Sequence, residues 1–261
     1  MSKLLALVFG VVVYGLFGLT WAYFTGFVGG VVVPKSVDTG PLVPIAEALA
    51  IDLGCLALFF AHHSVMARAC AKHLISPFVP PAVERSTYVL VSSLALGLVM
   101  AMWRPLPHVV WHAGGAARIL ALAIFWAGVL LALAASHILD GLQLFGVRQV
   151  LAHFRGRALP STTFRTPGPY RIVRHPLMTG VLMMLWGAPT MTAGHLLLAA
   201  VMSAYILAAV KWLEERDLRK ALGAEYERYQ RDVPMLLPLG APRRGPAEAH
   251  AAGPGEVRGR P

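Results

Sequence analysis

The chain has 261 residues, of which 57% are hydrophobic and 14% are charged, and its mean hydropathy is +0.62. Because soluble domains carry about a quarter charged residues, this composition excludes an ordinary soluble domain and indicates a multi-pass membrane protein. The formal net charge of +10 at pH 7 has three candidate explanations: binding to nucleic acid, contact with anionic lipid, and the asymmetry of basic residues across a membrane.

Four long hydrophobic runs occupy the first part of the chain, and each is long enough to cross a bilayer at about 1.5 Å per residue. No small-residue cleavage site follows the first run, so we expect that run to be retained. We predict a bundle of four transmembrane helices over residues 1–139, with the spans Leu4–Phe27, Ile45–Ala67, Thr87–Trp103 and Ile119–Leu139.

A polar segment, Asp140–Arg174, separates this bundle from two shorter hydrophobic halves. The halves are Leu177–Thr192 and His195–Trp212, joined by Ala193-Gly194. Pro189 predicts that the first half ends or kinks there, since proline breaks a helix interior. Together the two halves predict a hydrophobic helical hairpin.

The remaining sequence completes the predicted domain organisation. Residues 140–239 form a region with the hairpin and a cytoplasmic helical tail, and residues 240–261, rich in Gly, Pro, Ala and Arg, are predicted to be disordered. The two cysteines, Cys55 and Cys70, lack the spacing of metal ligands, so we expect no metal site. The predicted fold class is an all-α integral membrane protein.

The distribution of basic residues predicts the topology. Of the 23 lysines and arginines, all but Lys35, Arg104 and Arg118 fall in segments that this arrangement places on one side of the membrane. By the positive-inside rule that side, which includes both termini, is the cytoplasm. The positive charge therefore reflects topology and lipid contact, and we expect no nucleic-acid partner.

A first polar cluster precedes the hairpin, between Pro169 and Pro176. A residue before proline avoids helical dihedrals and proline suits a first helical turn, so His175 should precede a helix that begins at Pro176. The helix N-terminus attracts anions, and Arg174 adds positive charge there. Gly180, one turn later, lets a ligand or another backbone approach closely. The alternative is that the arginines are ordinary interfacial anchors.

A second polar cluster follows the hairpin. The carboxylates of Glu214 and Glu215 suit the ammonium or ribose hydroxyls of a ligand held by His175, and Tyr226 and Tyr229 suit stacking on a purine. The alternatives are a solvated helix end, with Glu215 paired to a basic residue four positions later, and ordinary interfacial tyrosines.

The two clusters together carry a family resemblance. Pro-Tyr-Arg-x-x-Arg-His-Pro-x-x-x-Gly, a hydrophobic hairpin, Glu-Glu-x-x-Leu and Gly-x-Glu-Tyr-x-x-Tyr resemble the C-terminal signature of the isoprenylcysteine carboxyl methyltransferase and phospholipid methyltransferase superfamily. These are integral membrane enzymes that use S-adenosylmethionine. Met178 is a departure, because many members have an aromatic residue there. By this resemblance the cofactor-binding residues are Tyr170, Arg174, His175, Pro176, Gly180, Glu214, Glu215, Tyr226 and Tyr229.

Three segments of the first part narrow the resemblance. His62–Arg68, Glu84–Tyr88 and His137–Gln149 resemble the NnrU-type membrane proteins, and among these the bacterial enzymes that methylate methanethiol. The resemblance implies S-adenosylmethionine-dependent, in-line S-methylation of methanethiol, a small alkyl thiol, to dimethyl sulfide. The implied partners are the thiol and the lipid bilayer.

Such a transfer needs a deprotonated thiol that is aligned with the methyl group and shielded from water. Ionisable groups in or at the edge of a span are costly and usually functional, so the candidate bases are Asp140, His62 and His63. Adjacent helical residues point about 100° apart, so at most one of the two histidines faces a common pocket. Each candidate can instead serve only a contact between helices.

Two other functions stay open at this point. A methyltransferase of a prenylcysteine or lipid would need a lateral opening between helices, whereas a small thiol needs a closed cavity. A non-enzymatic accessory protein for denitrification or haem handling would use histidines as ligands. Against the accessory protein, the sequence has no Cys-x-x-Cys-His motif, and His108 and His112 are predicted on the side opposite the signature.

Overall fold

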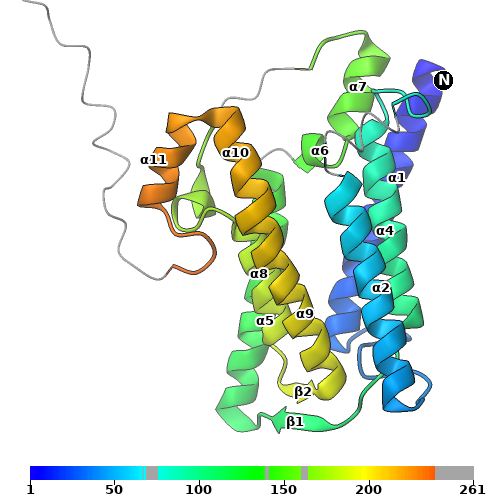
Figure 1. Cartoon of the computed structure of the whole chain (residues 1–261), viewed down its shortest axis with the longest axis vertical. Coiled ribbons are helices and arrows are strands. Elements are labelled where there is room, and N and C mark those ends of the chain that lie inside the picture. The colour runs from blue at the N-terminus through cyan, green and yellow to red at the C-terminus, as the bar shows by residue number, and fades with distance from the viewer. Residues whose placement is uncertain (67, 69–75, 139–140, 160–163, 239–261) are drawn as a thin grey trace, which may run out of the picture.

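The computed structural model describes residues 1–66, 68, 76–138, 141–159 and 164–238. Over these residues the regular structure is helical apart from two short strands (Figure 1). The first part contains α1 Lys3–Gly29, α2 Ile45–Met66, α4 Glu84–Met102, β1 Val109–His112, α5 Gly115–Ile138, α6 Gly141–Leu144 and α7 Val147–Arg155. The second part contains the 3₁₀ turn η1 Gly168–Arg171, α8 Pro176–Trp186, β2 Thr190–Thr192, α9 Ala193–Ala208, the π-helical turn η2 Ala209–Glu214, α10 Glu215–Leu222 and α11 Ala224–Asp232.

Among the described residues, five helices are long and apolar enough to cross a membrane. They are α1, α2, α4, α5 and the continuous helix Ala193–Leu222, which α9, η2 and α10 form together. The apolar helix α8 has 11 residues, about 16 Å of helix, which is about half of a hydrocarbon core. The protein therefore has the mostly helical, membrane-type fold that its composition indicates, with helix ends that differ by a few residues from the predicted spans.

The turn of the predicted hairpin lies earlier in the chain than expected. α8 ends at Trp186, and the Thr192 hydroxyl accepts a hydrogen bond from the backbone N–H of His195 at 3.1 Å. Thr192 is thus the N-cap of α9, so Ala193-Gly194 is the start of the helix and the prediction that it forms the turn is wrong. The capping hydroxyl of Thr192 favours a helix start here more strongly than the single glycine, Gly194, favours a turn.

The two strands were not predicted, and they form a small antiparallel sheet. Val109 of β1 lies opposite Thr192 of β2, and His112 lies opposite Thr190. The hydroxyl of Thr192 also donates to Asp38 at 2.5 Å, which ties the loop after α1 to the sheet. Figure 1 shows this sheet at one end of the molecule and the N-terminus, α7 and α10 at the other.

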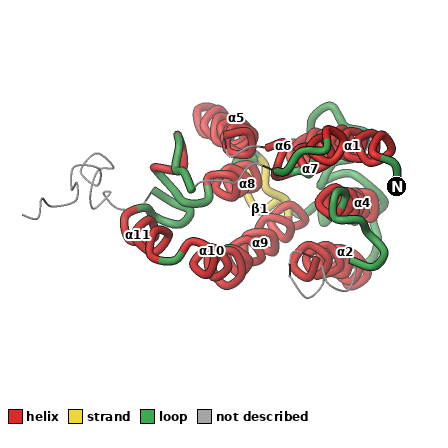
Figure 2. The backbone as a smooth tube through the Cα atoms, turned by 90° about the horizontal axis from the view of Figure 1, so that it is seen from above, coloured by secondary structure: helices red, strands yellow, loops and turns green. Residues whose placement is uncertain are grey.

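The helices pack as two groups with few backbone contacts between them (Figure 2). α1, α2 and α4 pack together, with α7 along α1, and we call this group the first half. α5 packs along α8, which leads into α9, α10 and α11, and this group is the second half. Packing thus groups α5 with the hairpin, whereas the predicted division at residue 139 groups it with the first three spans.

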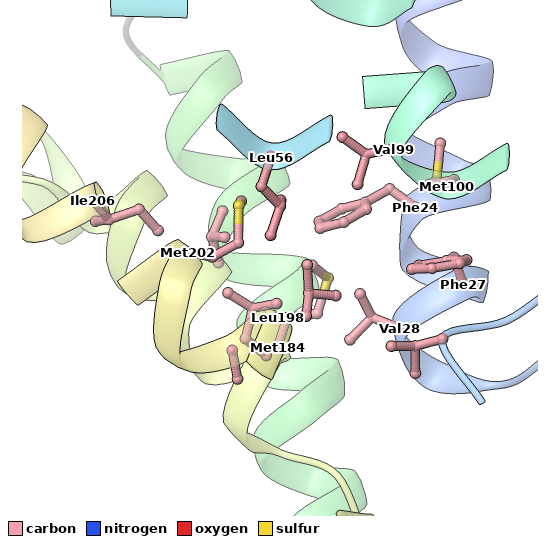
Figure 3. Close-up of a cluster of buried hydrophobic side chains, with 14 of the residues drawn as sticks. Phe24, Phe27, Val28, Leu56, Val99, Met100, Met184, Leu198, Met202 and Ile206 are labelled. Carbon is pink, nitrogen blue, oxygen red and sulfur yellow. The ribbon is translucent and has the colours of Figure 1, made fainter. Parts of the chain in front are cut away.

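An apolar core joins the two halves, with side chains from α1, α2 and α4 facing those of α8 and α9 (Figure 3). Within the second half, α5 and α8 approach so closely that a Cβ on Gly180 would lie 2.5 Å from the carbonyl oxygen of Gly128. Glycine at both positions lets the two backbones touch. This contact fixes the start of α8, and with it the position of His175. The buried side chains labelled in Figure 3 are Phe24, Phe27, Val28, Leu56, Val99, Met100, Met184, Leu198, Met202 and Ile206.

Candidate active site

The structure places His175 at the N-cap of α8, with Pro176 as the first helical residue, as the sequence predicts. The helix dipole favours negative charge at this position. The carboxylates of Glu214 and Glu215 supply this negative charge. Glu214 Oε2 lies 3.5 Å from His175 Nδ1, and Glu215 Oε1 lies 3.3 Å from His175 Nε2. Two polar clusters about 40 residues apart in sequence therefore meet at one point.

Glu215 is the centre of a closed, buried network. Its side chain is 9% exposed, and its Oε1 accepts hydrogen bonds from Nε and Nη2 of Arg174 at 2.7 and 2.6 Å. The other oxygen accepts from the side-chain amide of Gln230 at 3.0 Å. Both oxygens are thus satisfied, as a buried carboxylate requires. Glu215 holds α10 against the start of α8 and has little capacity left for a ligand.

Glu214 differs from its neighbour in exposure. Its side chain is 48% exposed and lines the main cavity of the protein, while one oxygen stays within reach of His175. Burial alone would lower the pKa of His175, but hydrogen bonds and charge from Glu214 and Glu215 outweigh burial and raise that pKa to about 9. His175 is therefore protonated at neutral pH, and its charge orients the Glu214 carboxylate at the edge of the cavity.

The segment after α11 completes this network. The backbone N–H groups of Arg174 and His175 donate to the carbonyls of Pro234 and Met235, at 2.9 and 3.1 Å. Nη1 of Arg174 also donates to backbone carbonyls at the end of α11, those of Gln230, at 2.9 Å, and of Val233. These two carbonyl groups therefore occupy the Nη1 donors of Arg174, while Nε and Nη2 bind Glu215.

The tyrosines of the signature form an aromatic cluster beside the network. The ring of Tyr229 lies edge-on to those of Tyr226 and Phe164, with centroid distances of 5.8 and 5.4 Å. The hydroxyl of Tyr229 donates to the carbonyl of Tyr170 at 2.5 Å, and burial together with the charge of Glu214 raises the pKa of Tyr170 to about 12. These three tyrosines stabilise the protein interior here and are not among the residues that line the cavity.

The main cavity lies between the two halves and has a volume of about 1230 Å³. Its walls are mostly apolar and come from α1, α2, α4, α5, α8, α9, η2 and α10. Pockets for small molecules usually measure about 300–1,000 Å³, so this cavity has room for a nucleotide-sized ligand and a second small molecule. Gly180 faces α5 instead of the cavity, and Met178, the departure from the family pattern, lines it.

Polar side chains gather at the end of the cavity near Glu214. The Tyr88 hydroxyl lies 3.0 Å from Nδ1 of His63, and the guanidinium of Arg85 lies 5.1 Å from the centre of the Tyr88 ring. Across the cavity from α4, the hydroxyls of Ser64 and Tyr205 lie 3.0 Å apart and link α2 to α9. All five side chains line the cavity. This set offers a proton acceptor and positive charge beside the carboxylate of Glu214.

The three candidate bases have different positions. His63 lines the cavity, whereas His62 does not, as expected for adjacent residues of one helix. Asp140 lies outside the described residues, as do Cys70 and the predicted tail, residues 240–261. Among the residues that the structure describes, no group of three or more His, Cys, Asp and Glu side chains could hold a metal ion.

Several residues at the cavity were not predicted. Tyr205 and Ser64 contribute through a contact between residues far apart in sequence. Arg68, which follows α2, pairs with Asp217 of α10 at 3.1 Å. The π-helical turn η2 immediately precedes Glu215 and rotates the register of the last span. No periodicity in the sequence marks this turn, whereas the family resemblance of the His62–Arg68 segment is a sequence signal for Ser64.

Comparison with known proteins places this helical, membrane-type chain among the methyltransferases. Residues 116–225 match the phospholipid methyltransferase family. The chain is 47% identical to methanethiol S-methyltransferase 2 of Bradyrhizobium diazoefficiens, over 91% of this chain and 91% of that protein. It is 43% identical to methanethiol S-methyltransferase of Mycobacterium tuberculosis, over 91% of this chain and 98% of that protein.

The chain therefore belongs to the methanethiol S-methyltransferase family, which confirms the resemblance seen in the sequence. Nurim of Sus scrofa is a more distant relative, 34% identical over 81% of this chain and 79% of that protein. No solved structure matches the chain.

Proposed function

We propose that the protein transfers a methyl group from S-adenosylmethionine to methanethiol and forms dimethyl sulfide. The observation that carries the proposal is the convergence of His175 and Glu214 at the polar end of an apolar cavity that also contains His63. Two curated relatives that match over most of the chain are named for this activity. Their names favour the enzyme over a non-enzymatic accessory protein.

The residues around the cavity fit a sulfonium nucleotide. Glu214 presents a half-exposed carboxylate that suits an ammonium or ribose hydroxyls, and His175 orients it. The aromatic residues Trp21 and Phe24 line the cavity, and aromatic faces attract a positively charged sulfur. The buried Nε1 of Trp21 has no hydrogen-bond partner in the described part of the chain, so it can bind a ligand.

The residues assigned to the cofactor by family resemblance have different roles under this proposal. Glu214 contacts the ligand directly. Arg174 and Glu215 position Glu214 and His175, because their polar groups are engaged with each other. The three tyrosines support this network, Tyr229 through its bond to the Tyr170 carbonyl and Tyr226 through ring packing. Pro176 and Gly180 set the start of α8 and its distance from α5.

When bound, S-adenosylmethionine supplies the methyl carbon, which passes to the thiol sulfur while the donor sulfur keeps the electron pair of the broken bond. His63 accepts the thiol proton at a ring nitrogen, and the Tyr88 hydroxyl, 3.0 Å from Nδ1, orients the ring. Arg85 adds positive charge that favours the thiolate over the thiol. The apolar walls exclude water from the reacting sulfur.

The polar end of the cavity faces the cytoplasm in this proposal, within a bacterial inner membrane. The N-terminus, α7 and α10 lie at that end, and all but three of the 23 lysines and arginines belong to segments assigned to it (Figure 1). Lys35 and Arg104 belong to the loops at the opposite end, near the small sheet. The cofactor, which is polar and cytoplasmic, then reaches Glu214 without crossing the membrane.

The activity is tested with membranes that contain the protein, labelled S-adenosylmethionine and methanethiol. Labelled dimethyl sulfide in the headspace is the expected product, and its absence would reject the function. Glu214→Gln should weaken S-adenosylmethionine binding by about 10- to 100-fold in calorimetry on detergent-purified protein, because one charged hydrogen-bond partner is lost. Unchanged affinity would reject the cofactor assignment.

The base is tested by comparing two neighbouring variants. His63→Gln should lower kcat by about 10²- to 10⁴-fold and remove the acidic limb of the pH profile. The matched variant His62→Gln should keep the wild-type profile, because His62 does not line the cavity. The rate and pH profile of Asp140→Asn are measured in the same way, because Asp140 is the third candidate base. If His63→Gln retains the wild-type rate and profile, His63 is not the base.

A further inference from the structure

The cavity extends well beyond the polar groups around Glu214. Along α1 its lining runs from Tyr14 to Thr25, about 16 Å of helix at about 1.5 Å per residue. On the last span, which belongs to the second half, the cavity lining runs from Glu214 back to Met202. The part of the cavity away from Glu214 is mostly apolar, and its polar groups include the hydroxyl of Ser93, which is 5% exposed, and the indole N–H of Trp21. Methanethiol, with one carbon and one sulfur, needs only a small part of this space.

The same cavity is open beside α1 and α5. Gly15, Gly18 and Ala22 of α1 line the cavity and are also exposed, so the cavity reaches the surface along this helix face. On α5, Leu133 and His137 have the same two properties. These α1 residues lie in the middle of the span Lys3–Gly29, so the opening faces the hydrocarbon region of a membrane and not the aqueous ends.

The glycines keep this opening wide. A Cβ at Gly15 or Gly18 would meet no atom within 4 Å, so neither glycine is needed for helix packing. Glycine in a helix interior costs about 1 kcal/mol relative to alanine, and here no close contact compensates for it. A second opening, near the exposed residues Glu214 and Asp217 of the last span, lies at the polar end. The cavity therefore has one apolar and one polar opening.

We propose that the opening between α1 and α5 admits the acceptor from the bilayer, and that the apolar depth behind it accepts alkyl thiols longer than methanethiol. The inference rests on the proposed function and extends its substrate class. For hexanethiol the sulfur is methylated, its proton passes to solvent through the base, and the products are methyl hexyl sulfide and S-adenosylhomocysteine. The hexyl chain lies along the apolar lining between α1, α4 and α8.

The chain-length dependence follows from the transfer of apolar surface out of water. Each buried CH₂ group contributes about 0.8 kcal/mol, so KM referred to the aqueous thiol should fall by about fourfold per added carbon until the cavity is filled. The experiment uses the full-length protein in proteoliposomes with saturating S-adenosylmethionine. Methanethiol, propanethiol and hexanethiol are compared, and the methyl sulfides are measured by gas chromatography.

Two variants test the route and the depth separately. Gly18→Leu narrows the opening and Ser93→Leu fills the apolar depth, so each should raise KM for hexanethiol by more than about tenfold and that for methanethiol by less than about threefold. Gly54→Leu is the control. Gly54 lies on α2 and does not line the cavity, and a Cβ at this position would meet no atom within 4 Å. It should leave both values unchanged.

The outcomes separate this inference from the proposed function. Dimethyl sulfide without methyl hexyl sulfide from the wild-type protein would overturn the inference and leave the proposed function intact. No methyl sulfide from any thiol would reject the proposed function itself. An equal loss with both thiols in Ser93→Leu would also overturn the inference, because a filled apolar depth must discriminate by chain length; this variant decides the question if Gly18→Leu does not fold.

Discussion

The two halves of the molecule treat their polar side chains differently. In the second half, Arg174, Glu215 and Gln230 form a closed network in which each group has a partner within the same half. In the first half, His63 and Tyr88 bond to each other and line the cavity, and their other contacts are mainly aromatic rings and the guanidinium of Arg85. The second half therefore resembles a rigid support, and the first half a surface that is ready to meet a small molecule.

Under the proposed function, this difference lets one fold serve two ligands of opposite character. A polar, charged nucleotide needs fixed charges, and these are cheap to hold in place only when a buried network satisfies them. An apolar thiol needs space and one proton acceptor. The cavity lies between the halves, so each wall can meet its own requirement, and the contacts of Tyr205 with Ser64 and Phe60 keep the walls in register.

Removal of Glu215, the centre of the buried network, should have the largest effect and tests most directly whether the two glutamates differ. Glu215→Ala leaves Arg174 buried without its partner, which should destabilise the protein by about 3–5 kcal/mol. The neighbouring variant Glu214→Ala, at a half-exposed position, should cost about 1 kcal/mol or less. Thermal unfolding in detergent measures both. Equal losses of stability would show that the two glutamates do not have separate roles.

A smaller effect is expected at the crossing of α5 and α8. In Gly180→Ala the new methyl group would lie 2.5 Å from the Gly128 carbonyl oxygen and 2.6 Å from the Ala132 nitrogen, so the helices must separate. Overpacking of this kind costs about 1–3 kcal/mol. Gly54→Ala, in open space on α2, should stabilise the helix slightly. If both variants unfold at the same temperature, the close crossing does not contribute to stability.

The pH dependence of stability should sharpen the comparison further, because it reports the charge of His175 alone. The pKa of His175 is raised from about 6.5 in the unfolded chain to about 9 in the fold, where the protonated ring contacts two carboxylates. The stability that this charge contributes is complete below about pH 6.5 and is lost as the pH rises through about 9. Wild-type unfolding temperature should thus fall more steeply than that of His175→Gln between pH 7 and 10. Parallel curves would contradict the assignment.

Much of the fold follows from local sequence signals. The four first-part spans, the start of α8 at Pro176 and the place of His175 before it depend on hydrophobic length and on the steric effect of proline, which act within a few residues. The prediction was wrong where a short-range signal was misjudged, at the Thr192 cap of α9. The sheet of β1 and β2 was missed because its pairing joins segments about 80 residues apart.

The sequence alone determined that the chain is a membrane-type helical protein, which family it resembles, and that His175 and Glu214 belong to one signature. Only the tertiary structure decided which carboxylate is buried and which meets the cavity, that His63 and not His62 faces it, and that α5 packs with the hairpin. The physical reason is that burial, ion pairing and cavity shape depend on contacts between helices, whereas span length and helix ends are set by neighbours along the chain.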